Sequence, residues 1–263
     1  MNLLKSKGLY KKAVLFFVVL LFTYFSFSQT IDSTKSIGYF GGAVSVTNNG
    51  ISLVPTFSLG KPAVIFDMVV GKRKLSFEPQ LRFALNGKPW SFLFWWRYKL
   101  VQTSKFAMNA GAHYALNFKT ITDSLNGVTK DVTLARRYLA AELFPRYLVA
   151  KNISVGMYYL YSHGIDPGTV KNTQFVTINS NFSNIGLSKQ FFMGITPQFY
   201  YLKQDTRDGV YFSSAFSLAK RNFPVALSSI INKEIQTNIL GSKDFVWNVT
   251  LIYSFNKKYV PIQ

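Results

Sequence analysis

The chain repeats one pattern along most of its length: apolar and polar residues alternate for about ten positions, and a turn sequence follows. The segment 90–100 shows this most clearly, because Trp96 and Tyr98 share one face while Arg97 and Lys99 share the other. Successive side chains of a β-strand point to opposite sides of the sheet, so each segment is expected to be a strand with one apolar and one polar face. No apolar run after residue 29 reaches the about 18 residues of a membrane-spanning helix, so none is expected there.

Turn residues, mainly Gly, Pro, Asn and Lys, divide the pattern into twelve expected strands. An even number of strands suits a closed antiparallel barrel whose two ends lie on one side of the membrane. Several segments are longer than the usual strand of a soluble sheet, which favours a tilted membrane crossing. The sequence therefore predicts an all-β fold, a closed antiparallel transmembrane β-barrel of about twelve strands near 51–59, 63–71, 75–85, 90–100, 106–118, 132–148, 152–163, 175–187, 190–203, 209–221, 225–240 and 245–255.

A soluble β-sandwich is the alternative, since it would bury the apolar faces between two sheets. The polar faces carry paired charges and small residues, as the lumen of a barrel would. Aromatic residues also gather near the expected strand ends, which is typical of the girdles at membrane interfaces. These aromatic residues are Trp90, Trp96, Tyr98, Tyr159, Tyr161, Tyr201 and Tyr253.

The N-terminus has the layout of a secretory signal over residues 1–28. A basic stretch precedes the apolar segment 13–25, and Ser26-Phe27-Ser28 supplies a small-x-small cleavage site. An uncleaved anchor is the alternative, but the apolar segment is shorter than the roughly 20 residues that span a bilayer. We expect residues 29–50 to form an N-terminal periplasmic or plug segment and residues 51–263 to form the barrel.

The charge balance is strongly basic, with 30 Lys and Arg against 11 Asp and Glu. Such a balance first suggests nucleic acid. Export argues against a nucleic-acid partner, and basic residues dispersed at strand ends suit lipid head groups or anionic glycolipid instead. The chain has no cysteine, which excludes a disulfide scaffold and a Cys-ligated metal site.

The chain resembles the Gram-negative outer-membrane β-barrels, through its signal-like start, its aromatic alternating strands and an aromatic-rich last strand ending at Phe255. The sequence Phe27-Ser28-Gln29 and the run from Thr47 to Ala63 (TNNGIS…KPA) are similar to barrels of Bacteroidota. One departure is that residues follow Phe255, whereas the assembly signal of such barrels commonly ends on the aromatic residue. The resemblance implies a location in the outer membrane in an uncharacterised subfamily, and it implies no particular activity.

Loop lengths give an expected orientation. The connections Lys119–Asp131 and Gly164–Gln174 are long, whereas those near residues 150 and 188 are tight. Barrels of this kind carry their long loops on the extracellular side. Both long connections are therefore expected outside the cell.

The polar strand faces define the expected lumen. Across the turn 86–89 the simplest register places Glu78 opposite Arg97, and a tighter turn at Asn86-Gly87 would place Ser76 opposite Arg97 instead. Either register keeps the charged residues on the inner face, because a shift of two residues preserves the alternation. The residues expected to line the lumen are Glu78, Arg82, Arg97, Lys99, His113, Arg136, Tyr138, Glu142, Arg146 and Glu234.

A lumen with more basic than acidic groups predicts a narrow channel for small anionic solutes. Arg–Glu pairs can also close a narrow barrel, so the alternative is a non-transport structural or assembly barrel of an envelope complex with an unknown protein partner. A membrane-embedded lipid hydrolase is a third hypothesis, with His113 and His163 as its possible bases. We expect no catalysis, because His113 should face the lumen and no G-x-S-x-G or metal-spaced His pair occurs, and we expect no cofactor or metal.

Overall fold

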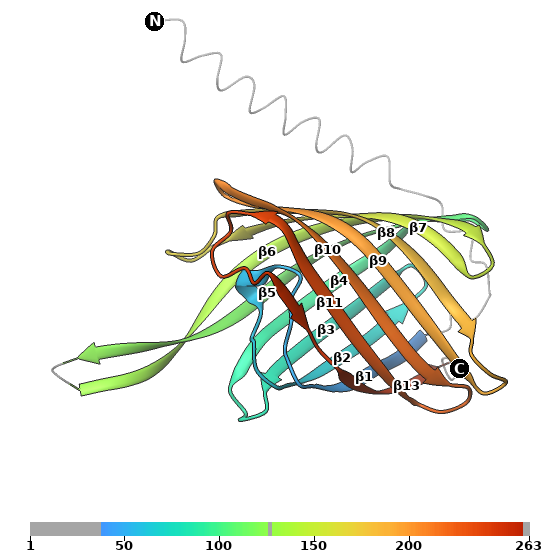
Figure 1. Ribbon diagram of the computed structural model, residues 1–263, viewed down its shortest axis with the longest axis horizontal. Coiled ribbons are helices and arrows are strands. Elements are labelled where there is room, and N and C mark those ends of the chain that lie inside the picture. Colours follow the sequence, from blue (N-terminus) through green and yellow to red (C-terminus); the bar gives the residue numbers. More distant parts are fainter. Residues whose placement is uncertain (1–37, 126–127, 260–263) are drawn as a thin grey trace, which may run out of the picture. The chain divides into compact units, whose positions relative to one another are not determined.

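The computed structural model describes residues 38–125 and 128–259, so the expected signal segment 1–28 and residues 29–37 lie outside the described residues. Nearly all of the described chain is β-structure (Figure 1). The elements are β1 (Gly38–Thr47), the short 3-10 helix η1 (Pro55–Phe57), β2 (Ala63–Lys72), β3 (Leu75–Ala84), β4 (Pro89–Gln102), β5 (Phe106–Leu125), β6 (Val128–Ala150), β7 (Ile153–Gly164), β8 (Asn172–Gly186), β9 (Phe191–Gln204), β10 (Arg207–Lys220), β11 (Val225–Thr237), β12 (Phe245–Trp247) and β13 (Thr250–Tyr259).

The strands form one closed antiparallel barrel. Each strand from β1 to β11 pairs with its neighbour in the chain, and β13 closes the ring by pairing with both β11 and β1. The short β12 precedes β13 along the same edge of β11, where the Asn248 side chain accepts a hydrogen bond from the Ile230 backbone N–H at 2.8 Å. The expected fold is confirmed as a barrel of twelve strands plus the short extra strand β12.

The first strand of the barrel differs from the expected one. Residues 38–47, expected as part of a periplasmic or plug segment, form β1 and pair with β2 and β13 along their whole length. Small side chains on its inner face, such as Gly41 and Ala43, hide the alternation that the other strands show. Glycine at position 42 is also required by close packing, since a Cβ there would lie 2.3 Å from the Asp67 carbonyl oxygen.

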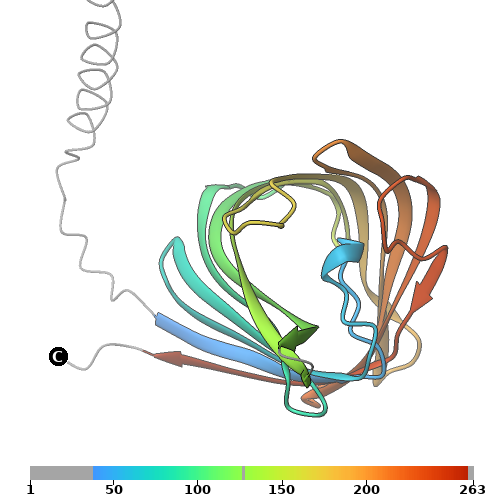
Figure 2. The ribbon, with the colours of Figure 1, turned by 90° about the vertical axis from the view of Figure 1, so that its left-hand side faces the viewer.

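Residues 51–59, expected as the first strand, instead lie in a loop that folds into the lumen. We call residues 50–60 the lumen insert. Its two ends meet where the Gly60 N–H donates to the Gly50 carbonyl at 3.2 Å. Within the insert, the Ser58 hydroxyl accepts a hydrogen bond from the Ser52 N–H at 2.9 Å. Figure 2 shows η1 inside the ring of strands. A loop that is closed at its neck and packed by its own side chains is a compact Ω-loop.

The outer surface of the barrel is apolar. All of the aromatic residues expected in the girdles are exposed except Trp90, which is 2% exposed and belongs to the inside of the barrel. None of the helices in the described part of the chain is long and apolar enough to cross a membrane. The exposed residues on the outward faces of the strands include Val46, Phe66, Val70, Trp96, Tyr98, Leu139, Tyr159, Phe199 and Leu251.

The two ends of the barrel differ in their connections. One end carries the short turns 73–74, 103–105, 151–152, 187–190 and 221–224. The other end carries residues 48–62, the loop 165–171, the loop 238–244 and the long β5–β6 hairpin, which projects beyond the other strands (Figure 1). Most of the connection expected at 119–131 is therefore an extension of β5 and β6 rather than a loop.

The orientation predicts a labelling pattern. Because the chain contains no cysteine, single cysteines at Thr122 and Pro167 would be unique reporters of the long-loop end. Both should react with a membrane-impermeant maleimide on intact cells, because barrels carry their long loops outside. The matched control Lys151→Cys, in a turn at the opposite end, should react only after the outer membrane is permeabilised. The reverse pattern would show that the barrel is inserted the other way round.

Candidate functional site: the charged lumen

One side of the lumen is an aromatic wall. Phe175, Tyr200, Leu202 and Tyr211 are at most 5% exposed there and form a buried cluster with Ile239. Tyr200 and Tyr211 stack with their ring centroids 4.8 Å apart. Leu53 and Val54 of the lumen insert pack against this cluster. The insert therefore packs against β8–β10 on this side of the lumen.

The lumen insert is tied to the other walls as well. The Trp90 indole N–H donates to the Phe57 carbonyl at 2.8 Å, and the Gln204 amide donates to the Thr56 hydroxyl at 3.0 Å. The Phe57 ring meets the Tyr138 ring edge-on, with centroids 5.1 Å apart. These contacts come from β4, β9 and β6, so the insert is fixed to different sides of the lumen.

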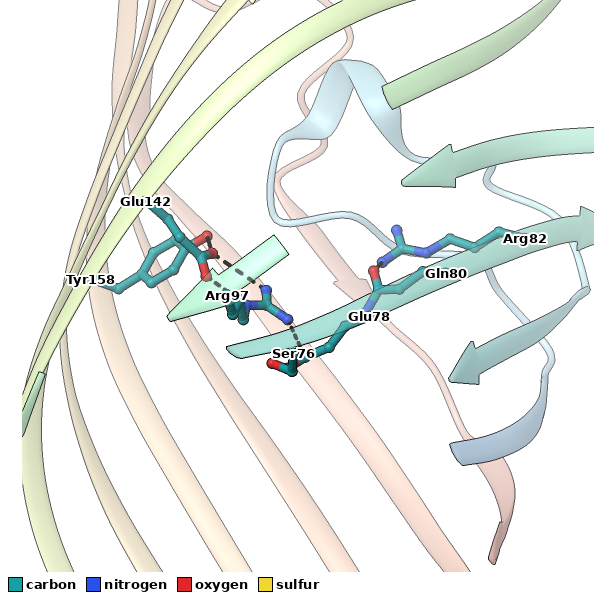
Figure 3. Close-up of polar contacts among 7 residues, drawn as sticks. All are labelled: Ser76, Glu78, Gln80, Arg82, Arg97, Glu142 and Tyr158. Carbon is teal, nitrogen blue, oxygen red and sulfur yellow. Dashed lines mark hydrogen bonds and ion pairs between the residues drawn. The ribbon is translucent and has the colours of Figure 1, made fainter. Parts of the chain in front are cut away.

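The centre of the charged wall is a network around Arg97, which we call the Arg97 brace (Figure 3). Arg97 Nε lies 2.6 Å from Glu142 Oε1, and Arg97 Nη1 pairs with Glu78 Oε2. The Tyr158 hydroxyl donates to Glu142 Oε2 at 2.7 Å, and the Ser76 hydroxyl donates to Glu78 Oε1 at 2.7 Å. Two carboxylates therefore share one guanidinium, and side chains of four strands are joined across the inner face.

A glycine makes the longest span of the brace possible. Gly111 lies on β5 between Arg97 and Glu142 and pairs with both of them. A Cβ at position 111 would lie 2.8 Å from Glu142 Oε1 and 3.1 Å from Arg97 Cγ. The missing side chain is what allows Arg97 to reach across β5 to Glu142.

The register of the β3–β4 hairpin corrects the simplest expectation. Ser76 pairs with Arg97, and Glu78 pairs with Trp95, so Arg97 reaches Glu78 diagonally instead of lying directly opposite it. The turn is tighter than assumed, and Trp90 is an extra residue in a bulge between the pairs Arg82–Ser91 and Phe83–Pro89. The bulge turns Trp90 inward, which explains why this residue is absent from the outer girdle.

Arg82 occupies a different environment from Arg97. Its Nη2 donates to Gln80 Oε1 at 2.9 Å, and its guanidinium carbon lies 5.3 Å from the centre of the Trp90 ring. No carboxylate lies within salt-bridge distance of it among the described residues. The charge of Arg82 is thus oriented but not neutralised by a contact.

The remaining expected residues are spread along the lumen. His113 is 9% exposed and meets the Trp95 ring edge-on, and Tyr138 is 6% exposed beside the insert. Lys99 lies 5.8 Å from the Tyr39 ring, nearer the short-turn end. Arg146 shares the inner face of β6 with Glu142 and is exposed. The Glu234 carboxylate accepts a hydrogen bond from Ser242 at 2.8 Å at the long-loop end.

The loop 165–171 positions the last of these residues, Arg136. Arg136 Nη1 donates to the Gly168 carbonyl at 3.0 Å. The loop is held by Asp166, which accepts from the Arg137 backbone N–H at 2.6 Å, and by Lys171 Nζ, which donates to the Asp166 carbonyl at 2.8 Å. Hydrogen bonds from the Arg137 side chain keep the pKa of Asp166 below its usual value of 3.8, so this carboxylate is charged at neutral pH.

Several lumen residues were missed by the sequence analysis. Asp67 pairs with Gln80 and so shares the inner face with Arg82. The sequence feature that could have identified Asp67 is that it is the single charged residue in the otherwise apolar segment 63–71. Tyr158 and Asn232 were missed as well, and each makes a hydrogen bond across strands, Tyr158 to Glu142 and Asn232 with the Tyr200 hydroxyl at 2.8 Å.

The lumen contains two adjoining cavities that share Phe57, Asn117 and Tyr138 in their linings. The outer cavity, at the long-loop end, measures about 510 Å³ and carries Lys119, Arg136 and Arg207 with one carboxylate, Asp205. The inner cavity measures about 360 Å³ and carries Arg82 and Arg97 with no carboxylate in its lining. Phe57 and Tyr138 therefore lie at the boundary between two cation-bearing chambers.

The two histidines differ in exposure, since His113 is buried and His163 is exposed. His113 lines the inner cavity and also borders a shallow groove that His163 on β7 shares with Trp96 and Leu139, both of which are exposed on the outer surface. Within residues 38–125 and 128–259 there is no group of three or more His, Asp or Glu side chains suited to hold a metal ion.

Comparisons with known proteins give similarity to solved barrels alone. No family model matches the chain, and no curated protein matches it. An outer-membrane channel from Pseudomonas putida is 8% identical, with 84% of this chain and 95% of that chain covered and a TM-score of 0.49. The KdgM porin is 11% identical over 82% of this chain and 99% of its own, with a TM-score of 0.48. LpxR from Salmonella typhimurium is 9% identical over 82% and 100%, with a TM-score of 0.47.

The architecture itself determines where such a chain resides. A closed barrel has no unpaired sheet edge, so it satisfies its backbone hydrogen bonds without water. The outward faces of the strands are apolar and carry exposed aromatic residues, whereas the inward faces are polar. This chain is a transmembrane β-barrel of the outer-membrane type.

Proposed function

We propose that this barrel is a narrow channel that carries small anionic solutes across the outer membrane. The observation that supports this most strongly is the pair of adjoining cavities in the lumen, whose linings contain more cations than carboxylates. Fixed positive charge along a narrow, low-dielectric path attracts anions and repels cations. The long-loop end would be the extracellular mouth.

The proposed path begins in the outer cavity beside Arg136 and passes the Phe57–Tyr138 contact into the inner cavity. Arg82 supplies the positive charge of the inner cavity, because the charge of Arg97 is balanced by Glu78 and Glu142. Lys99 and Arg146 add further positive charge to the lumen toward the short-turn end. Arg82, and not Arg97, is therefore the residue we assign to anion attraction at the centre.

The Arg97 brace supports a second candidate, a non-transport structural or assembly barrel. The brace and the lumen insert both occupy the lumen, and side chains that brace the walls can serve rigidity alone. Solute movement separates the two candidates.

We also propose that lipid and anionic glycolipid surround the apolar exterior of the barrel. The motifs at residues 27–29 and 47–63 support a second proposal, that the chain originates among Bacteroidota.

Liposome swelling tests the channel. Purified barrel in liposomes should admit gluconate faster than glucose, and glucose faster than protonated glucosamine, because these solutes have nearly equal size and differ in charge. Equal rates would remove the anion preference. Swelling no faster than that of protein-free liposomes for all three solutes would favour the structural barrel.

The charge at the outer cavity predicts a change of selectivity. Arg136→Glu should lower the chloride-to-potassium permeability ratio by roughly twofold to fivefold, because it reverses a fixed charge beside the path. The ratio is measured from reversal potentials in planar bilayers. The matched control is Lys203→Glu, which makes the same charge change at an exposed position one residue before the inward-facing Gln204. An equal effect of both changes would mean that the long-range charge of the protein, and not the lumen, sets the ratio.

A further inference from the structure

Buried polar atoms without a partner gather around the inner cavity. Ser91 Oγ, His113 Nδ1 and Arg82 Nε have no hydrogen-bond partner among the described residues. Ser91 is 7% exposed and His113 is 9% exposed, and all three residues line the inner cavity. Leaving a buried polar group unpaired is costly, so three such groups at one cavity call for an explanation.

The three groups come from adjacent strands. Arg82 on β3 pairs with Ser91 on β4, whereas His113 on β5 pairs with Trp95, which is four residues further along β4. The orientation of two of them is fixed by packing: Gln80 and the Trp90 ring hold the Arg82 guanidinium, and the Trp95 ring holds the His113 imidazole. An arginine, a hydroxyl and an imidazole N–H are all hydrogen-bond donors to an anion.

Apolar and aromatic side chains, among them Leu93, Trp95, Tyr138 and Phe175, make up much of the rest of the inner cavity, together with neutral polar residues such as Asn117 and Thr173. A volume of about 360 Å³ lies in the range of small-molecule sites, which combine an apolar lining with a few oriented polar groups. A bare inorganic anion would leave the apolar and aromatic lining unused. An anion that carries an apolar ring would match both parts of the cavity.

We propose that the inner cavity is a binding site for a small aromatic monocarboxylate, whose carboxylate accepts hydrogen bonds from Arg82 and Ser91, while His113 lies further along the same lining beside the Trp95 ring. This inference rests on the proposed function, since it names the class of anion that the channel would carry. Arg97 lies in the same lining, but its charge is balanced by its ion pairs with Glu78 and Glu142. Its role is to fix the wall, and Arg82 remains to bind the ligand.

A titration of the full barrel in detergent micelles tests the site. The probe is para-nitrobenzoate, and binding is followed by quenching of tryptophan fluorescence, because Trp95 lines the cavity and Trp90 contacts Arg82. The neutral para-nitrobenzyl alcohol and the cationic para-nitrobenzylamine have similar shapes and report partition into the micelle. We expect saturable quenching by the carboxylate and only linear quenching by the other two probes.

Variants locate the site. Arg82→Met should weaken nitrobenzoate binding by about tenfold or more, because it removes a charge-assisted hydrogen bond, and Ser91→Ala should weaken it by a smaller factor. Arg146→Met is the matched control, since Arg146 also faces the lumen but does not line this cavity, and its affinity should equal that of the wild type. Migration as a heat-modifiable barrel in gel electrophoresis shows that each variant is folded.

The experiments distinguish failure of the proposed binding site from failure of the proposed channel function. Equal affinity in Arg82→Met, Ser91→Ala and the wild type would overturn the site, even if the barrel conducts anions. Linear quenching by all three probes would overturn it as well. Saturable, Arg82-dependent binding in a barrel without conductance would support the site and contradict the channel.

Discussion

Replacement of Arg97 by methionine is expected to lower the free energy of unfolding of the barrel by about 2–3 kcal/mol. The change leaves Glu78 and Glu142 close together without their shared cation, and the Glu142 side chain is only 4% exposed. Two carboxylates near one another repel, and a buried charge without a partner costs more than the pair contributed. The value is set below that of a fully buried pair because the Arg97 side chain is 27% exposed. Equilibrium unfolding in lipid vesicles, followed by tryptophan fluorescence, measures it.

Two further variants distinguish loss of the brace from loss of a large side chain. Neutralising the acids together with Arg97, as Arg97→Met with Glu78→Gln and Glu142→Gln, should recover most of the lost stability, because no unpaired charge remains. Arg137→Met breaks an exposed ion pair with Asp166 and should have a much smaller effect. A triple variant as unstable as Arg97→Met would mean that the packing of Arg97, and not its charge, matters.

Excision of residues 51–59 is expected to raise the single-channel conductance by roughly threefold or more, because residues of the lumen insert line both cavities and so obstruct the proposed path between them. The excision is local, since the Gly60 N–H already bonds the Gly50 carbonyl at the neck of the insert. It also removes Phe57, which meets Tyr138 where the two cavities adjoin. Conductance is measured in planar bilayers with the wild type and the shortened chain side by side.

Point variants give the control for this excision. Phe57→Ala should raise the conductance by a smaller factor, whereas Phe66→Ala, the same change at an exposed position on the outside of β2, should leave it unchanged. A shortened chain that is folded and conducts like the wild type would show that the insert does not limit the path.

The alternation of the strands was sufficient to predict the barrel, because a two-residue period with an aromatic outer face admits few other folds. It failed for residues 51–59 because Ile51, Leu53 and Phe57 alternate as a strand would. In the structure these residues lie in the lumen insert, where Leu53 packs on the aromatic wall of β8–β10 and Phe57 on Tyr138. A two-residue alternation shows which residues are apolar, but it does not show whether they face lipid or the lumen. Because the lumen of this barrel is itself partly apolar, an inserted loop can carry the same pattern.

The candidate site was predictable in its composition but not in its contacts. The alternation of inward and outward side chains placed the charged residues on one face of the strands. A register shift of two residues leaves that face unchanged. The tight turn and the bulge at Trp90 decided which of these residues meet, and Trp90 turns inward to reach Phe57 in a segment that the sequence had assigned to the wall. The contact between Arg97 and Glu142 also depends on Gly111, which had no distinguishing sequence signal.

The reversal potential of the wild-type barrel in a planar bilayer, under a gradient of potassium chloride, tests the central claim most directly. The account predicts discrete channel openings whose reversal potential lies toward the chloride equilibrium potential, and a shift away from it in Arg136→Glu. A reversal potential toward that of potassium would contradict the anion path. An absence of openings both in the wild type and after excision of residues 51–59 would contradict the channel itself.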